Sequence, residues 1–213
     1  MKLLGSLRSP YVRKVLVAAA ELELLDQIDL EIHSVHLAAH VPTVMNVNPL
    51  NKIPTLITDA DEVIFDSLVI CEFLNELAGG DILVLKDARR RLKTLQMHAL
   101  ASGLVDLLIM RLVEAAKPEI RQWPEVLDAT AAKINATLDY LEIRADELFA
   151  EGSTLGTLSV AVAVNYIDFR FASMHWRQTR PRLNEWHAHF STRPAIRDLP
   201  FVDTTPSLAG SVR

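Results

Sequence analysis

Ser9 precedes Pro10 at the point where a short apolar segment, residues 2–5, gives way to a helical pattern. Serine followed by proline is a common start of a helix, so capping alone explains the pair. A hydroxyl at such a position also lies in the positive partial potential of the helix amino terminus, beside free backbone N–H groups. Ser9 is therefore a candidate to stabilise a substrate thiolate by hydrogen bonding, without acting as a nucleophile.

The helix amino terminus and the hydroxyl would act on such a thiol together. The helix dipole contributes roughly 0.3–1 kcal/mol, and a hydrogen bond to a charged acceptor contributes about 1.5–3 kcal/mol. Because one pKa unit corresponds to about 1.36 kcal/mol, the two would lower a thiol pKa of roughly 8.5 by about one to three units. A thiol bound beside Ser9 would then be abundantly ionised at neutral pH.

Two further clusters carry residues suited to a polar ligand. In the segment 51–56, Asn-Lys-Ile-Pro-Thr-Leu, a proline that opens a strand needs no functional explanation, and the sequence does not decide between its cis and trans forms. In the segment 65–68, Ser67 is a plausible helix cap that leaves the next N–H groups free to hold a carboxylate. Asp66 suits a ligand ammonium, and a turn aspartate before a helix explains it equally well.

Hydropathy patterns predict the elements that position these residues. Short strands are expected at 2–5, 28–35, 54–58 and 62–65, with a hairpin turn at 59–61 and a helix at 68–77. A helix from residue 12 to 22 has an apolar face, with Arg13, Lys14 and Glu21 on the opposite face. The remainder predicts helices at 87–116, 123–150, 158–171 and 181–190, and an extended tail from residue 200. The composition changes near 79–87, between an α/β module and an all-α one.

The composition excludes several classes of protein. Half of the 213 residues are apolar and 23% are charged, which excludes intrinsic disorder. A net charge of −5 gives no general attraction to nucleic acid. Cys71 is the sole cysteine, so an intrachain disulfide is impossible, and we expect it to be a small core residue. With no signal peptide and no apolar run near the roughly 18 residues of a membrane span, we expect a soluble, cytoplasmic protein without a membrane partner.

The order of the clusters is more specific than any one of them. Ser9-Pro10-Tyr11-Val12-Arg13-Lys14, then 48–56, then Phe65-Asp66-Ser67, ahead of an all-helical half, resembles the glutathione S-transferase superfamily, and in particular its bacterial serine-type, transferase-like members. The resemblance implies a thioredoxin-like module of β-α-β-β-β-α type at 1–79, which binds glutathione. It also implies an all-helical domain at 87–213 that contributes the second-substrate pocket, and a homodimer.

The resemblance also implies a role for each site residue. Ser9 matches the hydroxyl that faces the glutathione sulfur. Ile53-Pro54 matches the cis-proline step, at which the backbone before proline pairs with the cysteinyl part of glutathione, and Lys52 lies where a polar side chain meets the glycyl carboxylate. Asp66 and Ser67 match the pair that receives the γ-glutamyl ammonium and carboxylate. Glutathione would be a co-substrate, and no metal is expected.

Two departures from the family pattern leave alternatives open. Relatives often carry tyrosine or cysteine at the sulfur, so Ser6 or Tyr11 could lie nearer to it than Ser9. Relatives also often open the central helix of the second domain with Ser/Thr-x-x-Asp, a capping box. Here residues 157–160 read Thr-Leu-Ser-Val, so we expect Thr157 to cap without a reciprocal carboxylate.

Other candidate residues carry weaker indications. His187 and His189 are two residues apart, which on a helix directs them about 200° apart, so a shared metal is not expected. The basic run 89–91 is typical of a solvated face, with an anion or partner contact as the alternative. Met110 and Arg111 fall where the family lines its second-substrate pocket.

Two functions are carried forward. The first is a glutathione transferase that directs the thiolate at a small electrophile, with glutathione-dependent isomerase, dehalogenase or peroxidase chemistry as variants. The second is a non-catalytic protein of the same fold that binds ligands or docks on a partner. Fold alone does not separate them, because function depends on the site.

Overall fold

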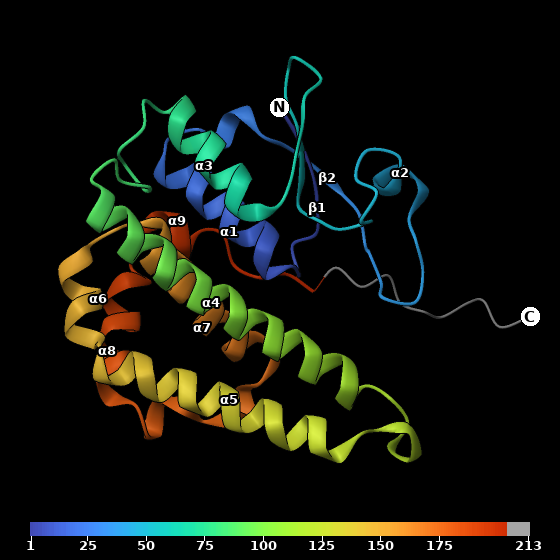
Figure 1. The fold of residues 1–213 in the computed structure, drawn as a ribbon, viewed down its shortest axis with the longest axis vertical. Helices are drawn as coiled ribbons and strands as arrows, with labels where there is room; N and C mark the ends of the chain where they lie inside the picture. Colours follow the sequence, from blue (N-terminus) through green and yellow to red (C-terminus); the bar gives the residue numbers. More distant parts are fainter. Residues whose placement is uncertain (204–213) are drawn as a thin grey trace, which may run out of the picture. The chain divides into compact units, whose positions relative to one another are not determined.

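The computed structural model describes residues 1–203 (Figure 1). Contacts between residues divide the chain into two compact units. The first unit contains Met1–Leu74 and the segment that begins at Leu199, and the second is Asn75–Asp198. The predicted extended tail is described only over 200–203, where it forms neither helix nor strand; its remainder lies outside the described residues.

The first unit alternates strands and helices in the predicted order. Its elements are β1 (Lys2–Gly5), α1 (Pro10–Glu21), a 3-10 turn η1 (Leu25–Gln27), β2 (Asp29–Ile32), α2 (Pro42–Met45), β3 (Thr55–Ile57), β4 (Val63–Ile64) and most of α3 (Ser67–Leu77), whose last three residues belong to the second unit. The sequence analysis did not predict the one-turn helix α2. It did not predict the 3-10 turn η1 either. The other elements confirm the predicted order of strands and helices: β1 has the predicted bounds, and β2, β3 and β4 are shorter than expected.

The four strands form one mixed sheet in the order β2-β1-β3-β4. β1 runs parallel to β2 and antiparallel to β3, and β3 runs antiparallel to β4. In the register of these pairs Leu4 lies opposite Thr55, and Leu56 lies opposite Ile64. This mixed sheet, with α1 in the β1-to-β2 crossover, is the predicted thioredoxin-like arrangement.

Helix α1 packs closely on the sheet at its amino-terminal end. A Cβ atom added to Gly5 would lie 2.7 Å from Cγ1 of Val12, closer than side chains approach one another. Val12 and Val15 are fully buried with Leu3 of the sheet. Glycine at the end of β1 therefore allows the first turn of α1 to lie close to the sheet.

The prediction that Arg13 and Lys14 lie on an exposed face of the first helix was wrong. Their exposed fractions are 5% and 3%. Burial of such cations requires compensating contacts. The Arg13 Nε donates to the Leu199 carbonyl at 2.6 Å, and the Lys14 ammonium lies 5.5 Å from the centroid of the Tyr11 ring. The sequence pattern missed this because the partner of Arg13 is 186 residues away in the chain.

The second unit is entirely helical over its described residues. Its elements are α4 (Ala88–Ala115), η2 (Glu119–Arg121), α5 (Pro124–Ile143), α6 (Ala145–Glu151), α7 (Leu155–Arg170), η3 (Ala172–Met174), η4 (Trp176–Gln178), α8 (Pro181–Phe190) and α9 (Pro194–Arg197). The predicted helix 123–150 is divided at Arg144, whose φ of −106° and ψ of 16° interrupt the helix. Asp87 caps α4 as predicted, accepting a hydrogen bond from the Arg90 N–H at 2.9 Å.

Helix α7 starts one turn earlier than expected, which corrects the prediction about its cap. Thr154 is the N-cap, and its hydroxyl accepts from the Thr157 N–H at 3.3 Å. The Thr157 hydroxyl accepts in turn from the Thr154 N–H at 2.9 Å, so a reciprocal capping box is present. Two threonines supply it because a hydroxyl, like a carboxylate, can accept from the backbone. The expected loss of the reciprocal partner came from placing the box three residues too late.

Helix α7 lies at the centre of the helical unit, against α4. A Cβ atom on Gly156 would lie 2.8 Å from the Thr94 carbonyl oxygen, so the backbones of the two helices are in close contact there. By length and apolar composition alone α4 could cross a membrane, a test that core helices of soluble proteins also pass. This corrects the expectation that no segment qualifies. Leu104 and Leu108 of α4 are buried, and 28% of its most apolar window is buried within the described residues.

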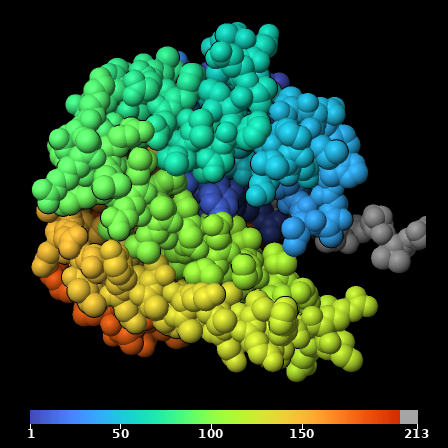
Figure 2. All heavy atoms as spheres, viewed as in Figure 1, coloured from blue at the N-terminus to red at the C-terminus, as the bar shows by residue number. Residues whose placement is uncertain are grey.

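The connection between α4 and α5 is held by a nearly buried carboxylate. Glu114 accepts from the Lys117 ammonium at 2.6 Å and from the Trp123 N–H at 2.7 Å. These hydrogen bonds, the Lys117 bond foremost, lower the pKa of Glu114 below its ordinary value. Figure 2 shows this yellow-green connection as a projecting end of the helical unit, where Ile120 and Trp123 are exposed.

Candidate functional site

The strand register brings the predicted site segments to one end of the sheet. β1 ends at Gly5, where the turn to Ser9 begins, and the antiparallel β3 begins at the same end, just after Pro54. β4 is antiparallel to β3, so it ends there too, just before Asp66. Residues from three separate stretches of sequence therefore surround one end of the sheet, although no single stretch indicated this.

Ser9 is the N-cap of α1, as the sequence predicted. Its backbone is extended, with φ of −82° and ψ of 124°, and its Oγ accepts from the Val12 N–H at 3.3 Å. A serine hydroxyl has one donor and two acceptor positions. The cap uses one acceptor position, and the hydroxyl proton makes no hydrogen bond within residues 1–203. Ser9 is half-buried, so its hydroxyl at the helix amino terminus is partly accessible from outside the protein.

The two alternative hydroxyls have different surroundings. Ser6 is buried, and its Oγ accepts from the Arg8 N–H at 3.4 Å while its carbonyl accepts from the Ser9 N–H at 3.0 Å. Tyr11 lies within the first turn of α1 and its ring contacts the Lys14 ammonium. Of the three, only Ser9 occupies the N-cap position.

The Ile53-Pro54 peptide bond is cis, which the sequence left open. The preceding loop is fixed by Asn48, a residue whose role the sequence analysis missed. The Asn48 amide is buried and donates to the Lys52 carbonyl at 3.1 Å and to the Thr55 hydroxyl at 2.9 Å. The Thr55 hydroxyl donates to the same carbonyl at 2.9 Å. An asparagine seven residues before a buried threonine is too common a pattern to have revealed this network.

These contacts leave the groups at 52–53 available to a ligand. The Lys52 side chain is exposed and forms no ion pair within the described part of the chain. Between residues 1 and 203, no hydrogen bond involves the backbone N–H or C=O of Ile53. Backbone groups normally find partners, so a segment in which both groups are unpaired is suited to pair with an extended ligand backbone.

Asp66, and not Ser67, caps the next helix, which corrects the predicted cap. Helix α3 begins at Ser67, and the Asp66 Oδ1 accepts from the Leu68 N–H at 3.0 Å. The Phe65-Asp66 peptide bond is also cis. Asp66 is exposed while Ser67 is 4% exposed. A carboxylate and the amino terminus of a helix are thus adjacent, a pairing that suits the ammonium and carboxylate of a zwitterion.

Cys71 is not part of this site. It is fully buried in α3, as predicted, and burial raises the pKa of its thiol to about 12. A thiol with that pKa is not ionised at neutral pH. The single cysteine of the chain therefore supplies no thiolate to this site.

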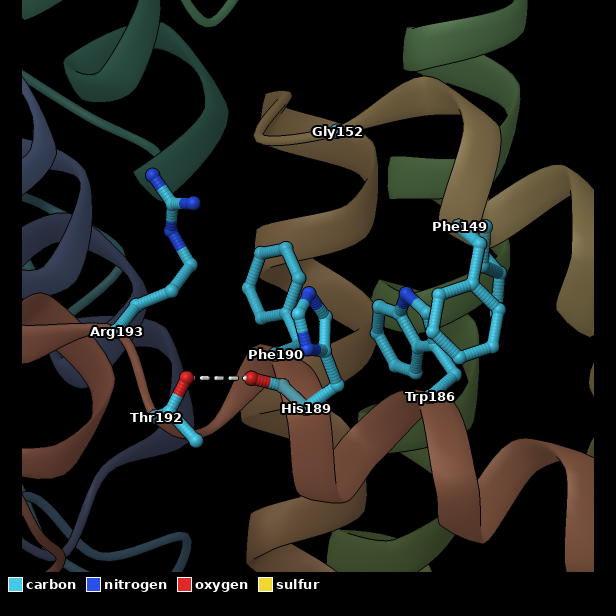
Figure 3. Close-up of a pocket in the computed structure, with 8 residues that line it drawn as sticks. Phe149, Gly152, Trp186, His189, Phe190, Thr192 and Arg193 are labelled. Carbon is cyan, nitrogen blue, oxygen red and sulfur yellow. Dashed lines mark hydrogen bonds between the residues drawn. The ribbon is translucent and has the colours of Figure 1, made fainter.

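The helical unit contains a separate, shallow pocket of about 210 Å³ (Figure 3). Its lining includes the rings of Phe149, Trp186, His189 and Phe190. The Arg193 guanidinium lies over the Phe190 ring, 5.6 Å from its centroid. The His189 and Phe149 ring centroids are 5.9 Å apart. None of these residues was predicted to bind a ligand.

The remaining candidates of the helical unit have structural surroundings. His187 is buried, with its Nε2 3.2 Å from the Asn165 Oδ1, whereas His189 is exposed, so the two histidines face different environments. Arg111 donates from Nη1 to the Leu127 carbonyl at 2.5 Å and so joins α4 to α5. Met110 is exposed. The guanidinium of Arg111 is therefore used at least in part within the fold.

A thioredoxin-like mixed sheet followed by an all-helical unit defines the class of protein as one with the glutathione S-transferase fold. Residues 8–77 match the family described as "Glutathione S-transferase, N-terminal domain". The chain is 31% identical over 189 residues to the uncharacterized GST-like protein YibF of Escherichia coli (strain K12), across 86% of this chain and 90% of that protein.

Solved structures agree with this match. A glutathione transferase family member from Pseudomonas fluorescens Pf-5, solved with bound glutathione, is 33% identical with a TM-score of 0.88, over 93% of this chain and 98% of that one. A second structure from this organism, with bound S-(propanoic acid)-glutathione, is 34% identical with a TM-score of 0.84, over 95% and 100%. The chain therefore belongs to the glutathione S-transferase superfamily.

Proposed function

We propose that this protein is a serine-type glutathione S-transferase, in which Ser9 stabilises the thiolate of bound glutathione. The observation that carries the proposal is the Ser9 hydroxyl, which caps α1 through one lone pair and keeps its proton for a ligand. The bound glutathione and the bound glutathione conjugate in the Pseudomonas structures support this reading.

The ligand would lie across the end of the sheet. Its γ-glutamyl ammonium and carboxylate would meet Asp66 and the start of α3 beside Ser67, and its cysteinyl backbone would pair with the free N–H and C=O of Ile53, ahead of Pro54. Lys52 would approach the glycyl carboxylate. These contacts fix the sulfur near Ser9, because the ligand is held on both sides of its cysteinyl part.

The reaction uses groups of the ligand and of the helix amino terminus. The thiol gives its proton to solvent, and the thiolate forms a carbon–sulfur bond with a small electrophile as a leaving group departs with the bonding electron pair. The protein contributes proximity and stabilisation of the anion, without a covalent enzyme intermediate. Isomerase, dehalogenase or peroxidase variants would begin from the same thiolate.

The proposal extends to the organisation of the protein. Residues 1–79 would serve as the glutathione-binding domain and 87–213 as the domain that contributes the second-substrate pocket. A cytoplasmic homodimer is proposed, supported by apolar side chains that are exposed on the helices, among them Val69 and Leu77 of α3. Light scattering at defined protein concentration tests the dimer, and a monomer at micromolar concentration would contradict it.

Turnover of an aryl halide with glutathione tests the proposed function. We expect the Ser9→Ala variant to lose far more kcat than glutathione affinity, because the hydroxyl acts on the anion and not on the whole tripeptide. Ser9→Thr, which keeps a hydroxyl, is the matched control. Specific retention on immobilised glutathione without turnover of any electrophile would instead indicate a binding protein of the same fold.

A further inference from the structure

The segment from Leu199 to Asp203 runs along the turn that carries Ser9. Figure 1 draws this red segment beside the amino-terminal end of α1. The Leu199 carbonyl accepts from Arg13, and the Phe201 ring lies under the Arg13 guanidinium at 4.5 Å from its centroid. The segment therefore contacts α1 one helical turn beyond Ser9.

The same segment also contacts the chain before Ser9. The Val202 N–H donates to the Leu7 carbonyl at 3.3 Å. The Asp203 carboxylate lies 3.1 Å from the Arg8 Nε, a partly exposed ion pair. Contacts on both sides of one residue restrain the turn between them more than contacts on one side would.

Arg13 links these contacts to the cap itself. Its backbone N–H donates to the Ser9 carbonyl at 2.9 Å, so its position and the Ser9 backbone are coupled. Its guanidinium is buried, and burial lowers its pKa to about 10, which leaves it charged at neutral pH. A buried charge that loses its hydrogen-bond acceptor or its aromatic partner loses part of the compensation for its burial, so we expect its side chain to shift.

We propose that residues 199–203 form a strap that holds the Ser9 hydroxyl in place against the bound sulfur, and that Arg13 is the positioning residue through which the strap acts. This inference rests on the proposed function for its effect on chemistry. The strap itself is a statement about the folded chain and can be tested without any ligand.

The ligand-free test is hydrogen–deuterium exchange of the backbone amides of Ser9 and Val12 in the Phe201→Ala variant of the full chain. Removing the aromatic partner of a desolvated guanidinium should speed exchange of these amides by about tenfold. The matched control is Phe149→Ala, which truncates a partly exposed ring in the helical unit and should leave them unchanged. If the Ser9 amide of the Phe201→Ala variant exchanged at the wild-type rate, the strap proposal would be refuted.

A milder variant keeps the test decisive if Phe201→Ala fails to fold. Phe201→Leu retains apolar bulk but removes the ring face, and it should raise the exchange rate by a smaller factor. Arg13→Lys keeps the charge but replaces the planar guanidinium, whose Nε donates to Leu199, and should behave in the same way. Unchanged exchange at Ser9 in both variants would also overturn the strap.

The chemical test compares two backgrounds. In the wild type, Phe201→Ala should raise the pKa of the bound glutathione thiol and lower kcat several-fold with little change in KM. In the Ser9→Ala background the same change should have no further effect on that pKa. Equal shifts of the thiol pKa in both backgrounds would overturn the positioning role of Arg13. Absence of glutathione binding in the wild type would instead refute the proposed function. Amide exchange alone would then decide whether the strap exists.

Discussion

Replacing Ser9 with alanine should raise the pKa of the thiol of bound glutathione. The hydroxyl proton, unused within residues 1–203, is the donor that a thiolate would accept. A hydrogen bond to a charged acceptor contributes about 1.5–3 kcal/mol, which corresponds to a rise of about one to two pKa units. The N-cap bond to the Val12 N–H at 3.3 Å is lost as well. That loss should cost about 1 kcal/mol of folding free energy.

The two consequences are measured separately. Ultraviolet absorbance of the thiolate, followed against pH with bound glutathione, gives the thiol pKa, and urea denaturation gives the stability. Ser9→Thr should retain most of the lowered thiol pKa and of the stability. Ser6→Ala should leave the thiol pKa unchanged, because Ser6 is buried and its Oγ accepts from the Arg8 N–H within the turn. An unchanged thiol pKa in Ser9→Ala, or a shift in Tyr11→Phe instead, would refute the assignment of Ser9.

Three further outcomes follow from the contacts described. Asp66→Asn should keep the helix cap but weaken glutathione binding by about tenfold in calorimetry, since the ammonium loses an anionic partner; wild-type affinity would contradict its role. Glu114→Gln should lower the melting temperature at neutral pH. The pKa of Glu114 is lowered in the folded protein, chiefly by Lys117, so its carboxylate stabilises the fold above the ordinary pKa of 4.5 and loses this effect as the pH falls. The difference in melting temperature between wild type and variant should therefore narrow in acid, and a difference that does not change with pH would contradict this. Gly156→Ala should lower the free energy of unfolding, measured by urea denaturation, by about 1–3 kcal/mol, because the added methyl group would clash with the Thr94 carbonyl. Unaltered stability would show that α4 and α7 can move apart to accommodate the methyl group at little cost.

The fold was predictable where local patterns decide it. Alternating strands, the cap at Asp87 and the Ser9-Pro10 helix start depend on neighbouring residues, and each was placed correctly to within a few residues. The site could be predicted as a set of segments because the order of motifs matched a known family. The sequence did not show that the segments meet at one end of the sheet; that follows from the antiparallel pairing of β3 with both β1 and β4.

The failures have two physical causes: contacts between residues distant in sequence, and local contacts made by residues of common type. Arg13 was expected at the surface because its partners, Leu199 and Phe201, are nearly the length of the chain away. The capping box of α7 was misplaced because threonine at both positions does not resemble the expected carboxylate. Helical periodicity reports which face is apolar, and it does not report which cations a distant segment will cover.

The central claim is that one end of the sheet binds glutathione and ionises its thiol. Calorimetric titration of the protein with glutathione, and with S-methylglutathione as a ligand that has no thiol proton, tests it most directly. We expect both ligands to bind at neutral pH, with proton release only for glutathione and less of it in Ser9→Ala. No binding at millimolar glutathione would contradict the claim, and equal proton release from both ligands would show that the thiol is not the group that ionises.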